Sequence, residues 1–294
     1  MYLPQWYGCR NHSCLEATAK GWTHTLNRTP LGWADMGISK RMGDVLGQAV
    51  EAKLLNEVNE HPVKVSHLAI IMDGNRRFAW KSNIAAGLGH RIGKQKLETV
   101  LDWVLELKIP WFTVYALSTE NLTRPKDELD ILFKLYNEGL RDIADDERIH
   151  KNKVRVQIIG RRELLPKEVN DAIDYAESKT ADYDKYVFTV CLAYGSREEM
   201  LNAIQSIASE HAAGDLPLEK IDEKAVSSRL YTGEMPDPDL VIRTSGEERI
   251  SNFLLWQMAY SELYFTDVYW PSFQKKDLLK AVRTFQDRKR RYGE

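Results

Sequence analysis

The pattern of apolar residues along the 294-residue chain predicts an α/β fold: a single domain with a mostly parallel central sheet and helices on both faces. Short apolar runs of strand length alternate with stretches in which apolar residues recur at helical spacing. A strand, a helix and a further strand in succession form a right-handed crossover, which makes the two strands parallel. After Val63 there is no internal repeat, no low-complexity segment and no linker, so residues 63–294 are expected to form one domain.

The predicted elements follow one another closely. Residues 39–59 have a modest apolar face and mixed charge, which favours a helix covering a sheet edge over one lying on a membrane. The predicted strands are residues 63–72, 112–117, 154–159, 186–193, 239–242 and 263–265. The predicted helices are residues 93–107, 127–149, 166–180, 196–213 and 273–290. Ser196 and Glu199 have the spacing of a capping box at the start of one of these helices.

The segment before the domain has a different character. Residues 1–35 show no sustained period and are expected to be a poorly ordered extension, with Met36 as the natural start and residues 36–62 as an N-terminal helical segment. Cys9, His12 and Cys14 lie close together, as zinc ligands do, but the second ligand pair of such a site is absent and no metal is predicted there. Deletion of residues 1–35 is expected to leave folding and activity intact.

Composition argues against several classes of protein. The 41 Lys and Arg residues nearly balance 43 Asp and Glu residues, and a net charge of −2 disfavours bulk nucleic-acid binding while permitting a local basic pocket. Three cysteines form no disulfide framework, which favours a reducing cytoplasm. We see no secretory signal and no apolar stretch of transmembrane length. The prediction is a cytoplasmic protein with at most peripheral contact with a membrane surface.

Chemistry-bearing residues gather directly after three predicted strands, in residues 73–78, 118–124 and 243–251. Because loops that follow parallel strands project from the same edge of a sheet, we expect these three to meet. Each contains arginine, an acid, and a hydroxyl or amide. Guanidinium groups bind phosphate oxygens in bidentate fashion. The arginines of this set are Arg76, Arg77, Arg124, Arg243 and Arg249.

The kind of anion follows from what accompanies the arginines. Asp73 lies beside Arg76 and Arg77 at the end of a predicted strand. This combination indicates a site that binds an anion together with a metal ion. The chain contains no GxxxxGK[ST] sequence, and residues 87–93 (GLGHRIG) lack the glycine spacing of a dinucleotide loop. There is also no DDxxD box. The sequence therefore predicts diphosphate chemistry at a sheet edge, without a nucleotide-binding loop.

Three motifs carry a resemblance to a known family. HLAIIMDGNRR, YALSTENLTRP and DLVIRTSGEERISNFLLWQMAYSELYFTDVYWP closely resemble the cis-prenyltransferases, the family of undecaprenyl diphosphate synthase, over residues 67–293. The resemblance implies sequential cis-condensation of isopentenyl diphosphate onto an allylic prenyl diphosphate, giving a long polyprenyl diphosphate of about undecaprenyl length, the precursor of a glycosyl-carrier lipid. The Asn-Arg-Arg form of the first motif resembles archaeal and eukaryotic members, which favours geranylgeranyl or farnesyl diphosphate as the acceptor.

The resemblance also implies roles for individual residues. Asp73 would bind Mg²⁺, with Glu262 as a second acid at the metal, and would assist departure of the allylic diphosphate. Asn121 matches a proposed proton acceptor; because a neutral amide is a poor base, we expect it to position groups, with a diphosphate oxygen as the alternative acceptor. The implied substrate-binding residues are Gly74, Asn75, Arg76, Arg77, Phe78 and His90 of the allylic site, Ser118, Thr119, Glu120 and Arg124 of the second motif, and Arg243, Arg249, Ile250 and Ser251 of the isopentenyl diphosphate site.

The chain departs from the bacterial pattern at several positions. Arg76 replaces a glycine, and Phe78 and Leu122 replace tryptophans. Ala86 stands where bacterial members carry a phosphate-binding arginine, and Arg76 is expected to compensate. Glu248 replaces a histidine that is placed near the metal in the bacterial pattern. Glu248 is therefore not predicted to bind the metal. These changes concern the identity and size of the acceptor, whereas the reaction type is unaffected.

Two further expectations concern the product and the assembly. An apolar tunnel for the growing chain is expected between helices 93–107 and 127–149 and the sheet, although Leu101, Leu105, Leu132, Phe133 and Tyr136 are each more typical of plain core. Residues 291–293 match a C-terminal Arg-x-Gly that reaches the partner's diphosphate site in this family, which implies a homodimer. The alternative function is a non-catalytic subunit of a heteromeric prenyltransferase.

Overall fold

The computed structural model describes residues 33–233 and 235–288, with side chains from residue 47 onward. The residues considered as zinc ligands (Cys9, His12 and Cys14) and the C-terminal Arg-x-Gly therefore lie outside the described residues. The chain divides into two units, residues 1–46 and 47–294. Helix α1 spans Trp33–Glu60. Its residues 33–46 are the described part of the first unit, and the rest of the helix belongs to the second unit. The second unit contains the whole sheet.

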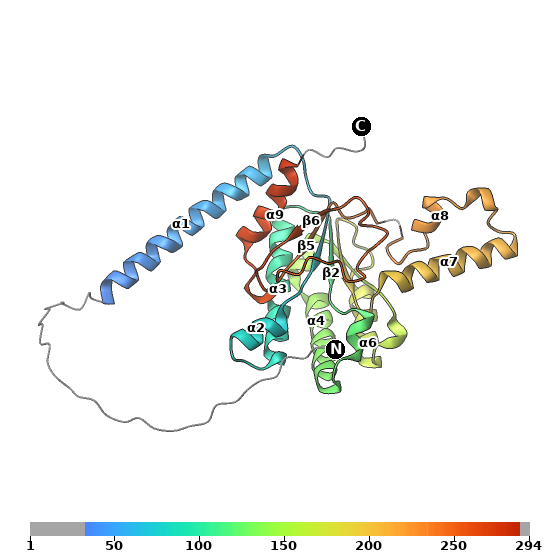
Figure 1. Ribbon diagram of the computed structural model, residues 1–294, viewed down its shortest axis with the longest axis horizontal. Coiled ribbons are helices and arrows are strands. Elements are labelled where there is room, and N and C mark those ends of the chain that lie inside the picture. The colour runs from blue at the N-terminus through green and yellow to red at the C-terminus, as the bar shows by residue number, and fades with distance from the viewer. Residues whose placement is uncertain (1–32, 234, 289–294) are drawn as a thin grey trace, which may run out of the picture. The chain divides into compact units, whose positions relative to one another are not determined.

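Six parallel strands form the centre of the second unit (Figure 1). Their spatial order is β3-β4-β2-β1-β5-β6, and every pairing between the described strands is parallel. The strands are β1 (His67–Ile71), β2 (Trp111–Tyr115), β3 (Val154–Ile159), β4 (Tyr186–Cys191), β5 (Leu240–Arg243) and β6 (Glu262–Phe265). The predicted α/β fold with a mostly parallel sheet is confirmed.

Strand order places a topological switch at the middle of the sheet. From β1 the chain proceeds through β2 towards β3 and β4 on one side, and later through β5 and β6 on the other. The central strand β1 is buried along its whole length, as expected for a parallel strand covered on both faces. In such sheets the crevice for ligands opens at the carboxyl ends of the strands beside the switch.

Helices cover one face of the sheet and form the larger core cluster. This cluster joins Leu68 and Ile70 of β1 to residues of α3, α4, α6 and α9, such as Leu278 and Leu279. The second face, with Ala69 and Ile71, packs against Phe253 and other residues of the segment that follows β5. The helices after α1 are α2 (Asn75–Lys81), α3 (Ala86–Glu106), α4 (Lys126–Asp145), α5 (Glu147–Asn152), α6 (Lys167–Thr180), α7 (Ser196–Ala213), α8 (Glu223–Ser227) and α9 (Lys275–Asp287).

Several predicted element boundaries were wrong. The first strand begins at His67 rather than at 63, and Asp239 Oδ2 accepts hydrogen bonds from the N–H groups of Ser66 and His67 at this end of the strand. Residues 87–93 were predicted to precede a helix, but α3 already begins at Ala86. The predicted helix 127–149 is two helices, α4 and α5, separated at Asp146.

The predicted capping box of α7 was also wrong. Gly195 is the residue that precedes the helix, and Ser196 Oγ accepts a hydrogen bond from Leu255 N–H at 2.9 Å. Glu199 is buried, and its carboxylate accepts hydrogen bonds from Tyr194 Oη at 2.5 Å and Tyr231 N–H at 2.8 Å. Burial raises the pKa of Glu199. Both side chains therefore bind other segments of the chain and not the start of their own helix. Among the described residues, no helix is long and apolar enough to cross a membrane.

Candidate active site

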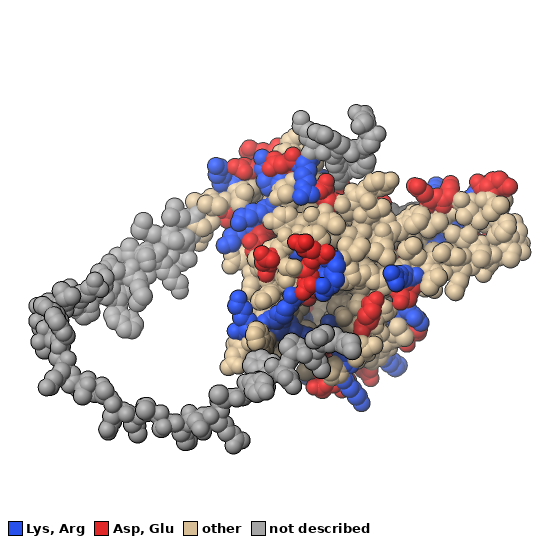
Figure 2. Space-filling model, viewed as in Figure 1, with Lys and Arg blue, Asp and Glu red and all other residues tan. Residues whose placement is uncertain are grey.

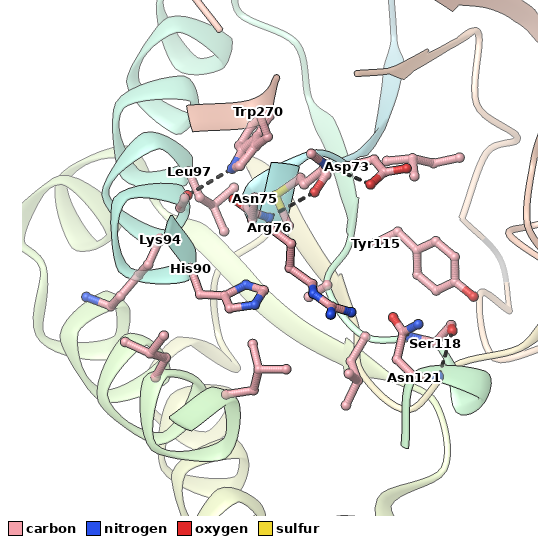
Figure 3. Close-up of a pocket in the computed structure, with 18 of the residues that line it drawn as sticks. Asp73, Asn75, Arg76, His90, Lys94, Leu97, Tyr115, Ser118, Asn121 and Trp270 are labelled. Atoms are coloured by element: carbon pink, nitrogen blue, oxygen red, sulfur yellow. Dashed lines mark hydrogen bonds between the residues drawn. The ribbon is translucent and has the colours of Figure 1, made fainter. Parts of the chain in front are cut away.

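The three predicted loops meet at a cavity of about 810 Å³ at the carboxyl ends of β1, β2 and β5 (Figure 3). These strands are neighbours in the sheet, so the residues that follow them emerge side by side. The space-filling view shows one face of the molecule, and near its middle Lys and Arg (blue) lie among Asp and Glu (red) (Figure 2). The predicted site residues that line the cavity are Asp73, Gly74, Asn75, Arg76, Arg77, His90, Ser118, Asn121, Arg124, Arg243, Arg249 and Ser251.

Four of the predicted substrate-binding residues do not line the cavity. Thr119 and Glu120 belong to the 3₁₀ helix η1 (Thr119–Thr123), where Glu120 Oε1 accepts a hydrogen bond from Asn252 Nδ2 at 3.1 Å. Ile250 packs on the core cluster of the second sheet face. Phe78 lies in α2, outside the lining. Their predicted contact with substrate therefore stays a prediction.

The first loop is shorter than predicted. Residues 73–78 were expected to be irregular, but α2 begins at Asn75, so Arg76 and Arg77 are presented from a helix. The turn depends on Gly74, whose φ of 106° lies in the left-handed region that favours glycine. A Cβ at Gly74 would also lie 2.8 Å from the Cβ of Ser245. The glycine thus allows the first and third loops to approach closely.

Asp73 joins the first loop to the third through two arginines. Its Oδ2 accepts a hydrogen bond from Arg243 Nη2 at 2.9 Å and lies 3.4 Å from Arg77 Nη2. Arg77 also donates to Glu247 Oε1 at 2.8 Å, and Arg243 donates to Ser251 Oγ at 2.9 Å. The side chain of Arg243 is only 4% exposed, and its buried Nε has no hydrogen-bond partner among the described residues. A buried cation with an unused donor is suited to an anionic ligand.

A second cluster on the other side of the cavity joins two arginines and a histidine to one acid. Oε1 of Glu128 lies 3.3 Å from His90 Nε2, 3.2 Å from Arg124 Nη1 and 3.8 Å from Arg76 Nε. Burial lowers the pKa of His90, and the hydrogen bond to Glu128 opposes this effect. Glu128 was not among the predicted site residues. The available signal was its position four residues after Arg124, the spacing at which side chains pair across one helical turn.

Ser118 and Asn121 shape the second loop. Ser118 Oγ accepts a hydrogen bond from Asn121 N–H at 3.2 Å, and Asn121 Oδ1 lies 3.5 Å from Ser118 N (Figure 3). The two residues form a capping box at the start of η1. Asn121 therefore faces the cavity while its amide oxygen lies against the backbone of its own loop.

The cavity continues from this charged mouth into an apolar part between α3, α4 and the sheet. Its walls include Leu97 of α3 and Leu132, Leu135, Leu140 and Ile143 of α4, with Val190 and Leu192 from β4 and the residue after it. Of the five residues left open between tunnel and core, Leu132 and Tyr136 line the cavity, whereas Leu101, Leu105 and Phe133 do not. Lys94, which was not predicted, also lines it and pairs with Glu98 and Asp142.

Comparisons with known proteins agree with this architecture. The family model described as putative undecaprenyl diphosphate synthase matches residues 71–293. The chain belongs to this family. The predicted membership of the cis-prenyltransferases is therefore confirmed, as is the predicted enzyme class, a transferase that makes polyprenyl diphosphates.

Relatives and solved structures place the chain within the family. A tritrans,polycis-undecaprenyl-diphosphate synthase (geranylgeranyl-diphosphate specific) of Thermoplasma volcanium is 48% identical over 258 residues, covering 88% of this chain and 100% of the relative. One of the same name from Methanopyrus kandleri is 49% identical over 267 residues, covering 87% and 98%. The crystal structure of lavandulyl diphosphate synthase from Lavandula x intermedia, in complex with dimethylallyl diphosphate, superposes with a TM-score of 0.74 at 33% identity, covering 81% of this chain and 100% of the other.

One predicted site residue of this cis-prenyltransferase lies far from the others. Glu262 is the first residue of β6 and pairs with Leu240 at the start of β5, whereas Asp73 follows the end of β1. The two acids therefore lie at opposite ends of the parallel strands. The carboxylate of Glu262 accepts a hydrogen bond from Arg288. Within a single chain, the structure does not bring Asp73 and Glu262 together. Among the described residues, no group of three or more His, Cys, Asp or Glu side chains could hold a metal.

Proposed function

We propose that this chain catalyses the Mg²⁺-dependent, sequential cis-condensation of isopentenyl diphosphate onto geranylgeranyl diphosphate, with a product of about undecaprenyl length that serves as the precursor of a glycosyl-carrier lipid. The observation that carries the proposal is a cavity with five arginines and Asp73 at its mouth and leucines in its depth. A prenyl diphosphate has the same two parts, an anionic head and an apolar chain. The names of the archaeal relatives favour geranylgeranyl over farnesyl diphosphate.

The charged groups divide into two diphosphate sites. Arg76, Arg124 and His90, which surround Glu128, bind the allylic diphosphate together with Arg77 and the start of α2. The isopentenyl diphosphate lies against Arg243, Arg249 and Ser251 on the side of the third loop. Guanidinium groups in fixed positions stabilise the charge that develops on the departing diphosphate.

Magnesium fits this arrangement through Asp73. Mg²⁺ is commonly bound by one or two carboxylates, several waters and the phosphates of the substrate, so it needs no complete protein cage. Asp73 would hold the ion at the junction of the two diphosphate sites, where its Oδ2 already faces Arg77 and Arg243. When bound, the metal supplies charge neutralisation for the leaving diphosphate.

The rest of the lining protects the reacting carbons. Separation of the allylic diphosphate leaves a carbocation that must meet the isopentenyl double bond before water does. Leu97, Leu132 and Trp270 provide apolar walls for that step. Asn121 keeps the second loop in shape through its hydrogen bond with Ser118. A diphosphate oxygen accepts the proton that is lost when the new double bond forms.

A homodimer completes the proposed assembly. Leu201 and Ile204 are 57% and 55% exposed although both are large and apolar. They are three residues apart, so they lie on one face of α7, which projects with α8 away from the sheet (Figure 1). A second copy of the chain would cover that face. We also propose that the enzyme works in the cytoplasm and contacts membranes only at their surface, where an apolar product leaves.

The decisive experiment tests activity and acceptor together. Purified full-length protein is incubated with Mg²⁺, labelled isopentenyl diphosphate and, in parallel, geranyl, farnesyl or geranylgeranyl diphosphate. We expect elongation to be most efficient with geranylgeranyl diphosphate and to stop when EDTA removes the metal. Elongation with none of the acceptors would favour the alternative, a non-catalytic subunit of a heteromeric prenyltransferase. The presence of Asp73 and Arg77 in the cavity disfavours that alternative.

A further inference from the structure

Glu128 contacts two arginines and a histidine at the cavity, and its role is not explained by either diphosphate site. These three side chains come from different elements: Arg76 from α2, His90 from α3 and Arg124 from the end of η1. All three side chains approach the same carboxylate oxygen, at 3.2–3.8 Å. Glu128 itself lies in the first turn of α4, is 12% exposed, and does not line the cavity.

The position of this carboxylate has an electrostatic consequence. Any diphosphate that binds His90, Arg76 and Arg124 must share them with an anion that is already within hydrogen-bond or ion-pair distance. Because Glu128 and the diphosphate carry charge of the same sign at short range in a partly buried site, each weakens the attraction of Arg76 and Arg124 for the other. The acid therefore lowers the affinity of this half of the site for diphosphate.

Lower affinity has a use in a repeated condensation. After each cycle, inorganic diphosphate occupies the allylic site and must leave before the elongated chain can bring its own diphosphate there. We propose that Glu128 is a positioning residue that acts through His90, Arg76 and Arg124 and weakens their hold on inorganic diphosphate, so that the site is cleared between cycles. This inference rests on the proposed function, which assigns the three side chains to the allylic diphosphate.

A purely structural role for Glu128 makes the opposite prediction. If the carboxylate served only to order these three side chains, its removal would leave them less well placed, and diphosphate would bind more weakly. If it acts as a competing anion, removal of its charge makes diphosphate bind more tightly. The sign of the change in affinity therefore separates the two roles.

The experiment measures binding of inorganic diphosphate, in the presence of Mg²⁺, to the full-length chain by titration calorimetry. Glu128→Gln removes the charge and keeps the shape. We expect its dissociation constant for diphosphate to fall about tenfold, or about 1.4 kcal/mol. The steady-state rate of elongation should fall because product release slows, while the first condensation in a single-turnover assay keeps its rate. Asp127→Asn is the matched control, since it neutralises the exposed neighbouring acid in the same helical turn and should change neither quantity.

The outcomes are distinguishable. An unchanged or larger dissociation constant for Glu128→Gln, with thermal denaturation like that of the wild type, would overturn the inference while leaving the proposed function in place. Glu128→Ala provides a second variant, for which tighter binding is again expected. If the wild-type chain binds no inorganic diphosphate, both the inference and the proposed allylic site fail.

Discussion

The carboxylate of Asp73 faces two guanidinium groups, and this contact defines the centre of the site at the scale of single residues. Arg243 is almost fully buried and has Asp73 as its acidic partner, whereas Arg77 is shared between Asp73 and Glu247. The sequence motifs predicted that Asp73 and the arginines beside it belong to the site, but they did not predict Glu128 or Glu247. Glu128 and Glu247 resemble ordinary surface acids in the sequence, because an acid two or four residues from an arginine is also common in surface ion pairs.

Replacement of Asp73 by Asn tests the proposed role in metal binding and diphosphate departure. The amide keeps an acceptor for Arg243 but loses the charge that attracts Mg²⁺. We expect turnover to fall at least about 100-fold, the order found when a preorganised charge-stabilising group is removed, while the protein stays folded. Steady-state kinetics and circular dichroism measure the two effects. Asp171→Asn, which disrupts only an exposed pair with Lys167, is the control. Near-normal turnover of Asp73→Asn would contradict the proposed role.

Asn121→Ala separates a positioning role from an essential proton-accepting one. The amide contributes a capping contact at the start of η1, and loss of such a contact costs about 0.5–2 kcal/mol. We therefore expect turnover to fall by about tenfold, with an unchanged dependence on pH between pH 6 and 9. A general base typically contributes 10²–10⁴-fold, so a loss of that size in a variant with wild-type thermal denaturation would show that the amide is more than a loop cap.

The packing of α2 against α3 explains, at the scale of elements, why residues 87–93 are rich in glycine. Gly89 and Gly93 are one helical turn apart and face the start of α2. A Cβ at Gly89 would lie 2.6 Å from the carbonyl oxygen of Asn75, and one at Gly93 would lie 2.2 Å from Asn75 Oδ1. Trp270 Nε1 also donates to the carbonyl oxygen of Gly93 at 2.9 Å. The glycines that resemble a ligand loop in the sequence therefore serve the close approach of two helices.

Gly89→Ala should displace the arginines of α2 from the cavity. The added methyl group would lie 2.6 Å from the backbone carbonyl oxygen of Asn75, so α2 must move, and the allylic diphosphate loses Arg76 and Arg77 from their proper positions. We expect the KM for the allylic substrate to rise about tenfold or more and the melting temperature to fall. The control is Gly47→Ala in α1, where nothing lies within 4 Å of the new Cβ and helix propensity favours alanine by about 1 kcal/mol. Wild-type kinetics for Gly89→Ala would contradict this packing.

At the scale of the whole molecule, a buried histidine in the central strand links stability to pH. His67 lies between Pro236, whose carbonyl oxygen is 2.6 Å from Nδ1, and Thr113, whose Oγ1 is 2.8 Å from Nε2. A neutral ring satisfies both contacts by donating from Nδ1 and accepting at Nε2. Burial lowers the pKa of His67 to about 4, an effect that the Pro236 carbonyl and Asp239 oppose only in part.

Stability should therefore decrease in mildly acidic solution. The unfolded chain binds a proton at His67 near pH 6.5 and the folded chain only near pH 4, so the unfolded state holds more protons between these values. The contribution is fully present above pH 6.5 and is lost as the pH falls to about 4, a change of about 3 kcal/mol. Urea denaturation at pH 7.5, 6 and 5 measures it. His67→Gln should show a shallower decrease, and an equal decrease in both proteins would contradict the assignment.

Assembly is the second property of the whole molecule. If α7 forms the contact between two copies, the double variant Leu201→Glu and Ile204→Glu places two charges on each side of it and should produce a folded monomer. Light scattering after size-exclusion chromatography measures the molar mass. Val50→Glu alters an equally exposed apolar residue of α1 and should leave the oligomeric state unchanged. A variant that stays dimeric would locate the contact elsewhere on the chain.

The sequence by itself determined the order of strands and helices, the edge of the sheet that carries the arginines, and the family. Each of these depends on local patterns or on contiguous motifs, because period, turn residues and motif spacing are properties of neighbouring positions. Helix boundaries near the site were predicted less well, since the start of α2 at Asn75 and the early start of α3 depend on contacts between the two helices.

Only the tertiary structure decided which charges face one another. His90 and Glu128 are 38 residues apart in the chain, and Asp73 and Arg243 are 170 apart, yet both pairs are in contact. Glu262, by contrast, belongs to a motif of the site, but it lies at the amino ends of the strands, whereas Asp73 lies at their carboxyl ends. Interaction energies between charges depend on distance and burial, and the chain acquires both only when β1, β2 and β5 align in one sheet.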